Sequence, residues 1–208
     1  MFYDSALFDF TQKFENNWRA IREEYLNLNR RILDFHRECV PYEEYAYKLL
    51  NNNGWTPSWQ LNSSEPNYNW LTYGLSYQGL FPQEAEQKFP ITASLLSKLN
   101  GIEVCGFSLM KPLSFIAPHA HRNVESNTLS YHLGLDVVPK KSYLSMNGIF
   151  EEESNGKSII FDVSHEHFAF NMSDANRVIL YMEFDKSKIA FKQPEEETTN
   201  SARSLTHT

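Results

Sequence analysis

The sequence predicts a mainly β protein with flanking helices, whose second half forms a sandwich or barrel of short strands. Three observations lead to this prediction. From Ile102 onward, runs of β-branched and aromatic residues recur at roughly 8–12-residue spacing. Turn pairs such as Asn147-Gly148 and Asn155-Gly156 separate several of these runs. Before Ile102, apolar residues follow a helical spacing in two places, which accounts for the flanking helices.

The first helix is predicted over residues 11–38, with Asp9 or Thr11 as its cap. Apolar side chains recur there at alternating steps of four and three, so they share one stripe. The stripe could pack on the chain's own sheet or form a coiled-coil seam in a homodimer. Its mixed aromatic residues favour the first, because they make a poor regular seam. The stripe consists of Phe14, Trp18, Ile21, Tyr25, Leu28, Ile32 and Phe35.

Residues 39–89 are expected to be irregular, because Asn51 to Pro57 is rich in turn-forming residues. Aromatic side chains crowd this region. They could form a substrate surface, or they could belong to loops that cover and plug the barrel. A short helix is expected over residues 90–101, since Pro90 opens an apolar run that Gly101 ends. The aromatic residues are Trp55, Trp59, Tyr68, Trp70, Tyr73 and Tyr77.

The strands are expected at 104–110, 113–121, 128–138, 142–150, 158–161, 167–171 and 177–184. We expect residues 1–192 to form a single domain. In it, residues 1–100 are a helical and loop-rich support and residues 101–192 are the β core. Residues 193–208 are acidic and then rich in Ser, Thr and Asn, so we expect a disordered tail.

Composition excludes several classes of protein. The chain has 208 residues and 41% hydrophobic content, enough to bury a core. A net charge of −7 argues against a nucleic-acid partner, which needs Lys and Arg to neutralise phosphates. Cys39 and Cys105 are far apart and are expected to be reduced thiols. No apolar run approaches the roughly 20 residues of a membrane span, and Met1 to Ser5 do not read as a secretory signal. We therefore expect a cytoplasmic protein.

Five of the seven histidines lie in the strand-rich half. Side chains two apart on a strand share a face, so His119 and His121 would point the same way. By the same rule, Ser130 and His132 share a face, as do Arg177, Ile179 and Tyr181. Imidazole is a common ligand of iron, zinc and copper. One buried histidine is usually a satisfied core residue, but several strands could each aim polar groups into one barrel.

The same segments resemble the aspartyl/asparaginyl β-hydroxylase family of iron(II)- and 2-oxoglutarate-dependent dioxygenases. The resemblance extends over most of residues 10–185, and it is specific for the family but not for a substrate. It implies a double-stranded β-helix, that is, a jelly-roll or cupin-like barrel supported by N-terminal helices. It rests on Phe14 to Arg22, Phe89 to Thr92, Phe107 to Pro112, Ile116 to His119, Leu129 to Leu135, Ile159 to His167 and Asn171 to Val178.

The resemblance also implies a site. His119 and His167 would bind iron(II) and form the catalytic centre. Arg177 would hold the far carboxylate of 2-oxoglutarate, for which a planar guanidinium is well suited. Ser108 and His132 would also contact this co-substrate.

Three departures from the family pattern leave alternatives open. His121 stands where typical members have Gly, so it could be a third metal ligand, a group that holds water, or a strand neighbour. The segment before His132 is about two residues longer than in the family. Aligning it differently would make His121 the first ligand, but the ungapped spacing from Ser108 favours His119. Ser130 stands where the family often has Arg, which removes one contact to 2-oxoglutarate, and Arg122 might replace it.

The expected function is hydroxylation of an unactivated C–H bond. The substrate could be an Asp or Asn residue in a peptide, a free amino acid, a small metabolite or a lipid acyl chain. One alternative is a metal-sensing or catalytically inactive protein of the same fold. Another is an enzyme that uses a different metal at His119, His121 and His167.

Overall fold

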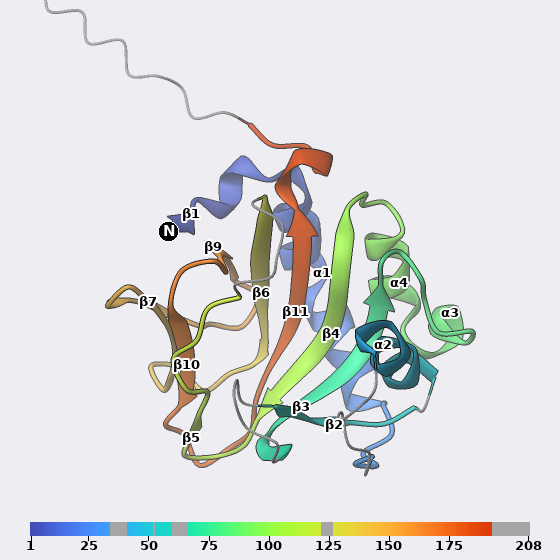
Figure 1. Ribbon diagram of the computed structural model, residues 1–208, viewed down its shortest axis with the longest axis horizontal. Coiled ribbons are helices and arrows are strands. Elements are labelled where there is room, and N and C mark those ends of the chain that lie inside the picture. Colours follow the sequence, from blue (N-terminus) through green and yellow to red (C-terminus); the bar gives the residue numbers. More distant parts are fainter. Residues whose placement is uncertain (34–40, 52, 60–65, 122–126, 193–208) are drawn as a thin grey trace, which may run out of the picture.

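The computed structural model describes residues 1–33, 41–51, 53–59, 66–121 and 127–192. The predicted tail, 193–208, and Cys39 lie outside these residues. The strands form two antiparallel sheets, a large one and a small one (Figure 1). The large sheet has the order β1 (Phe2–Tyr3), β9 (Ser158–Asp162), β6 (Thr128–Asp136), β11 (Arg177–Asp185), β4 (Ile102–Met110), β3 (Pro66–Tyr77) and β2 (Thr56–Trp59). The small sheet has the order β5 (Ser114–Phe115), β10 (His167–Asn171), β7 (Ser142–Met146) and β8 (Ile149–Glu152).

From β4 onward the chain winds between the two sheets. β4, β6, β9 and β11 belong to the large sheet, whereas β5, β7, β8 and β10 belong to the small one. Strands that follow one another in sequence therefore mostly face each other across the barrel instead of pairing side by side. This winding is a double-stranded β-helix, as the family resemblance implied.

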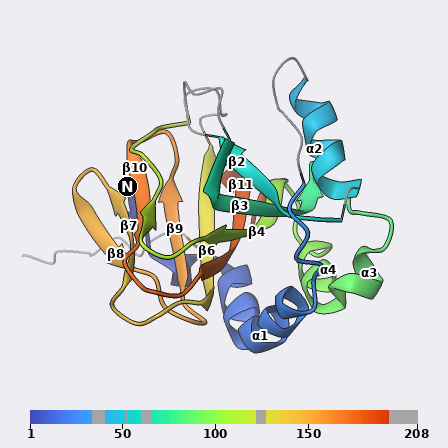
Figure 2. The ribbon, with the colours of Figure 1, turned by 90° about the horizontal axis from the view of Figure 1, so that it is seen from below.

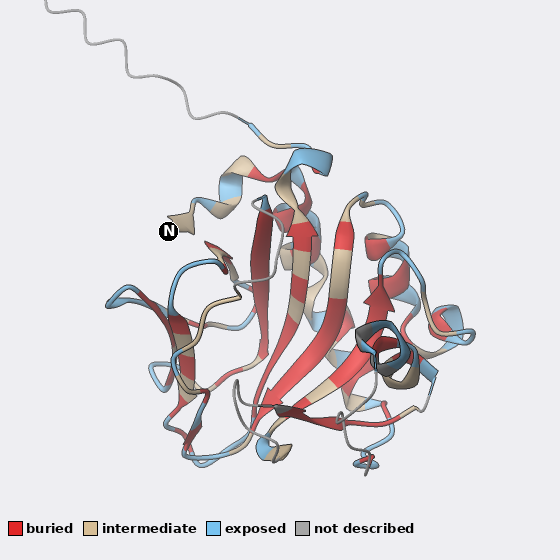
Figure 3. Ribbon diagram, in the orientation of Figure 1, coloured by how far each residue is buried: buried red, intermediate tan, exposed pale blue. Residues whose placement is uncertain are grey.

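The two faces of the large sheet have different roles, and β11 shows the division. Val178 and Leu180 point to the side that the helices cover, where they join the main hydrophobic core. Arg177, Tyr181 and Glu183 alternate with them and point toward the small sheet. We call the space between the sheets the barrel interior. Figure 3 shows that β4, β6 and β11 are buried along most of their length.

Helices cover the other face of the large sheet, on the side away from the small sheet (Figure 2). The helices of this layer are α1 (Asp9–Leu26), α2 (Tyr42–Asn51), α3 (Ala85–Lys88) and α4 (Pro90–Leu96), and short 3-10 turns occupy Ser5–Leu7 and Lys186–Lys188. No helix among the described residues is both long and apolar enough to cross a membrane.

The apolar stripe of the first helix packs on the chain's own sheet, as the sequence favoured. Phe14, Ile21 and Tyr25 are buried in the main core together with Phe107 and Tyr131. The stripe is thus covered within one chain, and a homodimer stays an untested expectation. The helix is shorter than predicted, because it ends at Leu26.

Tertiary pairing explains the early end of α1. The backbone N–H of Leu33 donates to the carbonyl oxygen of Trp55 at 2.7 Å, and Trp55 N–H donates to Arg31 at 2.8 Å. Backbone groups that pair with the strand region cannot also continue a helix. The remainder of the predicted helix, residues 34–38, lies outside the described part of the chain.

The expectation that residues 39–89 are irregular was wrong. This region contains α2, β2 and the twelve-residue β3, which pairs with β4 in the large sheet. Tyr68, Trp70, Tyr73 and Tyr77 belong to β3 and not to a covering loop, and a substrate surface stays an expectation. Trp55, Tyr73 and Tyr77 are buried structural residues, and Trp70 lies in the barrel interior near His119, with ring centroids 6.5 Å apart.

Three predicted segments differ from the observed ones. The strand expected over 113–121 is regular only at β5. Beyond it, Ile116 and His119 pair with β10 through backbone hydrogen bonds, and His121 bonds to Val163. The strand expected over 142–150 is a hairpin, because Asn147 (φ 48°) and Gly148 (φ 80°) adopt the left-handed conformations of a tight turn. The helix expected over 90–101 stops at Leu96.

Candidate metal centre

Three of the predicted site residues meet at one end of the barrel interior. His119, His121 and His167 each offer a ring nitrogen within 4.8 Å of the others. The ring centroids of His119 and His167 are 4.3 Å apart, and His121 lies 5.3 Å and 5.2 Å from them. We call these residues the three-histidine cluster.

Backbone pairing sets this arrangement. His119 and His167 form a two-bond bridge, in which each N–H donates to the other's carbonyl oxygen at 3.0 Å and 2.9 Å. The N–H of His121 donates to the carbonyl oxygen of Val163 at 2.9 Å. The segment after β5 is thereby fixed against β10 and the turn before it, although it is not a regular strand.

Each ring has an oxygen acceptor at Nδ1. His119 Nδ1 lies 2.8 Å from the carbonyl oxygen of Ala117, and His167 Nδ1 lies 2.8 Å from that of His165. His121 Nδ1 lies 2.9 Å from a carboxylate oxygen of Glu183. A proton on Nδ1 satisfies these acceptors and leaves Nε2 of each ring with a lone pair. This is the usual way in which proteins orient histidine ligands of a metal.

The electrostatic environment keeps the rings of His119 and His167 neutral. Burial lowers the pKa of His167 to about 3, against the opposing effect of its bond to the His165 carbonyl. Burial also lowers the pKa of His119. A neutral imidazole is the form that binds a metal, so the cluster is ready to bind one near neutral pH.

Glu183 is a member of the site that the sequence reasoning missed. Its carboxylate accepts hydrogen bonds from His121 and from the Tyr181 hydroxyl. Burial alone would raise the pKa of Glu183, but the hydrogen bonds from His121 and Tyr181 outweigh it, and the pKa lies below the usual value. An anionic carboxylate beside the three rings compensates the charge of a bound dication. The signal was present, since Glu183 continues the i, i+2 series of Arg177, Ile179 and Tyr181.

Two serines lie near the cluster. Ser108, predicted to contact 2-oxoglutarate, accepts a hydrogen bond from Trp70 Nε1 at 3.0 Å. Ser130 is fully buried and lies directly opposite Glu183 on the neighbouring strand. Its hydroxyl has no hydrogen-bond partner among the described residues. A buried hydroxyl without a partner is unusual and suits a ligand that reaches this part of the barrel.

The other two predicted co-substrate residues meet at a second carboxylate. Arg177 donates from Nε to Glu153 Oε2 at 2.6 Å and from Nη2 to Glu153 Oε1. His132 Nδ1 lies 3.0 Å from the same Oε1. We call Arg177, Glu153 and His132 the arginine recess. It adjoins the cluster through Phe161, whose ring centroid lies 5.1 Å from that of His132 and 5.2 Å from that of His167.

Glu153 could not be recognised from the sequence. It lies in an acidic run between two strands, which reads as a solvated turn, yet only 2% of it is exposed. Burial would raise the pKa of Glu153, but the charge of Arg177 and the bond to His132 hold it at about 2. Glu153 is therefore ionised, and Arg177 is fully buried against it.

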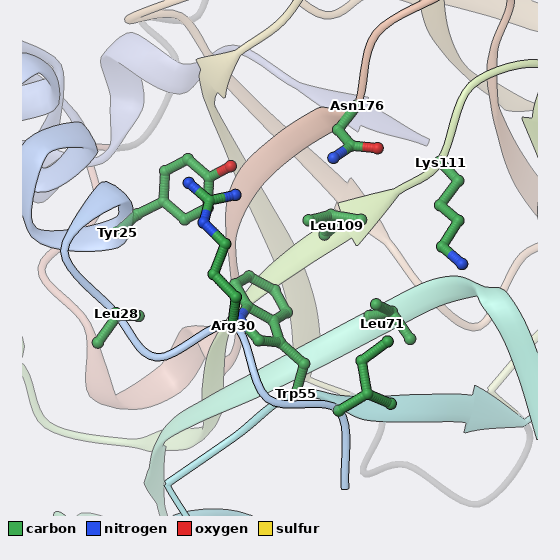
Figure 4. Close-up of a pocket in the computed structure, with 9 residues that line it drawn as sticks. Tyr25, Leu28, Arg30, Trp55, Leu71, Leu109, Lys111 and Asn176 are labelled. Carbon is green, nitrogen blue, oxygen red and sulfur yellow. The ribbon is translucent and has the colours of Figure 1, made fainter.

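A separate hollow of about 140 Å³ lies on the helix side of the large sheet (Figure 4). Its wall includes Tyr25, Leu71 and Leu109, which belong to the main core. Arg30 and Lys111 also line it. The hollow shares no residue with the three-histidine cluster or the arginine recess.

Known proteins resemble this chain in sequence. The ornithine lipid ester-linked acyl 2-hydroxylase of Rhizobium tropici is 26% identical over 187 residues, which cover 88% of this chain and 60% of that protein. The aspartate beta-hydroxylase domain-containing protein 2 of Homo sapiens is 29% identical over 157 residues, which cover 71% of this chain and 41% of that protein. The chain thus spans less than two thirds of the length of these relatives.

Among solved structures, an oxidoreductase of the 2OG-Fe(II) oxygenase family from Burkholderia pseudomallei is 13% identical, with a TM-score of 0.43. The match covers 79% of this chain and 98% of that one. The family described as Aspartyl/Asparaginyl beta-hydroxylase matches residues 15–187, which is most of the chain. This protein therefore belongs to the aspartyl/asparaginyl β-hydroxylase family.

Proposed function

We propose that this chain is an iron(II)-dependent hydroxylase that acts on an unactivated C–H bond. The observation that carries the proposal is the three-histidine cluster, in which each ring has Nδ1 engaged with an oxygen acceptor. Three imidazole nitrogens fit iron(II), although zinc and copper accept the same donors. Membership of a hydroxylase family favours iron among these metals.

His119, His121 and His167 would hold the metal, and bound iron(II) would supply the oxygen chemistry. The residues of the chain have separate tasks. The carbonyl oxygens of Ala117 and His165 fix the orientation of two rings, and Glu183 fixes the third. His121, with 28% of its side chain exposed, lies on the open side of the cluster, whereas His167 is buried. A substrate would therefore approach past His121.

The resemblance predicts 2-oxoglutarate as the co-substrate, and this remains a prediction for the chain. A keto acid could bind at the metal, and the unpartnered Ser130 hydroxyl suits such a ligand. Its far carboxylate does not fit Arg177 as the site stands, because Glu153 already takes the Nε and Nη2 donors. Insertion of one oxygen atom of O2 into a C–H bond leaves a second oxygen atom that two electrons must reduce. 2-Oxoglutarate would supply these electrons by conversion to succinate and carbon dioxide, bound through its keto-acid end and without a bond to Arg177.

The names of two relatives suggest the class of substrate that we propose. One relative is named as a hydroxylase of a lipid acyl chain and another as an aspartate β-hydroxylase domain protein. We propose that the substrate is an acyl chain, an amino acid or a peptide residue, and that hydroxylation occurs at a C–H bond close to a carbonyl group.

A second candidate is a metal-binding protein of the same fold that has lost turnover. The arginine recess favours it, because a carboxylate of the chain itself occupies the predicted co-substrate anchor. The two candidates differ in oxygen consumption, since only a hydroxylase consumes oxygen when metal and substrate are both present.

The experiment compares native protein with His167→Ala after anaerobic loading with iron(II). Oxygen consumption is measured with and without 2-oxoglutarate, against a panel of acyl amides, amino acids and aspartyl peptides. Native protein is expected to show iron-dependent uptake with one substrate class, and His167→Ala to lose it by at least about a hundredfold, because a ligand is removed. His165→Ala is the matched control, since that ring is exposed and lies outside the cluster. Equal uptake in His167→Ala and native protein would remove His167 from the site.

A further inference from the structure

The arginine recess is a complete carboxylate-binding site with its own carboxylate already inside. Arg177 presents the paired N–H groups of one edge, and Glu153 meets them with both oxygens. His132 adds a third contact to one of those oxygens at 3.0 Å. A guanidinium that donates two parallel bonds is the arrangement proteins use to bind a free carboxylate. Glu153 thus presents the chemical group that an external dicarboxylate would bring to these residues.

The backbone around Glu153 is held in several places. Glu153 N–H donates to the carbonyl oxygen of Ser142 at 3.0 Å, and Gly156 N–H donates to that of Gly134 at 2.8 Å. The Asn155 side chain accepts from Val137 N–H at 2.8 Å and donates to the Val137 carbonyl at 3.3 Å. Glu153 cannot leave by a simple swing of its turn, because these bonds would have to break.

Close packing fixes the same turn. A Cβ atom on Gly134 would lie 2.1 Å from the Ser154 carbonyl oxygen, so β6 and the turn approach as closely as backbone allows. If only the Glu153 side chain rotated away, Arg177 would keep a buried charge without a partner. Both partners of the pair are 1% exposed at the side chain, so the loss would be severe. The resident carboxylate is therefore a permanent part of the fold and not a lid.

We propose that Glu153 closes the arginine recess to external dicarboxylates, so that a keto acid bound at the three-histidine cluster gains nothing from a second, distal carboxylate. The inference concerns the specificity of the proposed metal site and rests on that site for keto-acid binding. It predicts that native protein does not distinguish 2-oxoglutarate from 2-oxopentanoate, which has the same five-carbon chain with a methyl group in place of the distal carboxylate.

The first experiment measures binding of both keto acids by calorimetry to anaerobic, iron(II)-loaded protein. Native protein is expected to bind them with affinities within about threefold, because no distal anchor is available. Glu153→Ala frees Arg177, so it should prefer 2-oxoglutarate by at least about tenfold, the value of one charge-assisted hydrogen bond. Adding Arg177→Met to this variant should abolish the preference. A tenfold preference in native protein that Glu153→Ala does not increase would overturn the proposal.

Glu153→Ala leaves the buried Arg177 charge without a partner and should lower stability, so Glu153→Gln is made in parallel. The amide keeps the volume but offers only one oxygen, and it turns an NH2 toward the N–H groups of Arg177. A dicarboxylate should therefore displace the glutamine side chain of the Glu153→Gln variant from Arg177. This variant should also prefer 2-oxoglutarate to 2-oxopentanoate, but by a smaller factor than Glu153→Ala. Glu24→Gln is the matched control, since Glu24 is a buried carboxylate at the helix layer, remote from the recess. A preference gained equally by Glu24→Gln would also overturn the proposal.

The second experiment needs no metal and separates this inference from the proposed function. Glutarate has the distal carboxylate but no keto group, and its effect on the melting temperature is measured with metal-free protein at constant ionic strength. It should stabilise Glu153→Ala or Glu153→Gln and leave native protein unchanged. If glutarate raises the melting temperature of native and variant protein equally, or raises neither, the closed recess is contradicted. Failure of both keto acids to bind, with the glutarate result as expected, contradicts only the proposed metal site.

Discussion

At the scale of residues, the site depends on which atom of each ring is already engaged. His119 and His167 donate from Nδ1 to backbone carbonyl oxygens, and these acceptors cannot be removed by mutation of a side chain. His121 instead depends on the Glu183 carboxylate. The third ring is thus the one whose orientation a side-chain substitution can change.

This difference gives a prediction for Glu183→Gln. Loss of the carboxylate should let the His121 ring reorient and should weaken metal affinity by about tenfold, the lower end for such supporting contacts. Competition with a chromophoric chelator measures the affinity for iron(II) or cobalt(II). Tyr181→Phe is a useful comparison, because it removes only one bond to Glu183 and should have the smaller effect. Unchanged affinity in Glu183→Gln would mean that His121 is not a ligand.

At the scale of elements, one carboxylate joins the first helix to the short helix before the barrel. Glu24 on α1 accepts hydrogen bonds from Ile91 N–H at 2.5 Å, Thr92 N–H at 3.0 Å and the Thr92 hydroxyl at 2.6 Å. These N–H groups belong to the first turn of α4. The N–H groups of a first turn have no acceptor within their own helix. Glu24 therefore acts as a cap supplied from another helix.

We expect Glu24→Ala to destabilise the protein by about 2 kcal/mol, because two N–H groups and a hydroxyl lose a charged acceptor. Urea unfolding followed by circular dichroism measures the change. Glu23→Ala is the control, since the neighbouring side chain is 68% exposed and should change stability little. Equal stability of the two variants would show that the cap is not important.

At the scale of the whole molecule, the buried imidazoles make stability depend on pH. The pKa of His167 is about 3 in the folded chain because of burial, compared with 6.5 as its ordinary value. Between these values the unfolded chain binds the proton and the folded chain does not, so stability falls as the pH is lowered. His119 and His132 are shifted in the same direction by burial and add to the effect.

Acidification from pH 6.5 to 5 should therefore cost metal-free protein about 2 kcal/mol from His167 alone, at about 1.4 kcal/mol per pH unit. Urea unfolding at constant ionic strength across this range measures it, and His167→Gln should show a shallower dependence. Glu153 contributes at lower pH, because its pKa of about 2 lies below the ordinary 4.5 and its stabilisation is lost between these values. A flat profile from pH 6.5 to 5 would contradict the burial of neutral rings.

The strand pattern predicted a sandwich or barrel, and the family resemblance implied its winding and named the three histidines that the structure brings together. Prediction from the sequence failed over residues 39–89, where β3 becomes a strand through pairing with β4 and not through its own pattern. The role of Glu153 also could not be predicted from the sequence. Its role depends on contacts with Arg177 and His132, which are 24 and 21 residues away. Glu183 could have been predicted, because it is the next residue after Arg177, Ile179 and Tyr181 on the same face of β11.

The most direct test is a crystal soaked anaerobically with manganese(II), which replaces iron(II) and gives an anomalous signal. The anomalous difference map should contain one peak inside the barrel, bonded to Nε2 of His119, His121 and His167 at about 2.1–2.3 Å. No peak at saturating metal, or a peak bonded through other residues, would contradict the assignment of this metal centre.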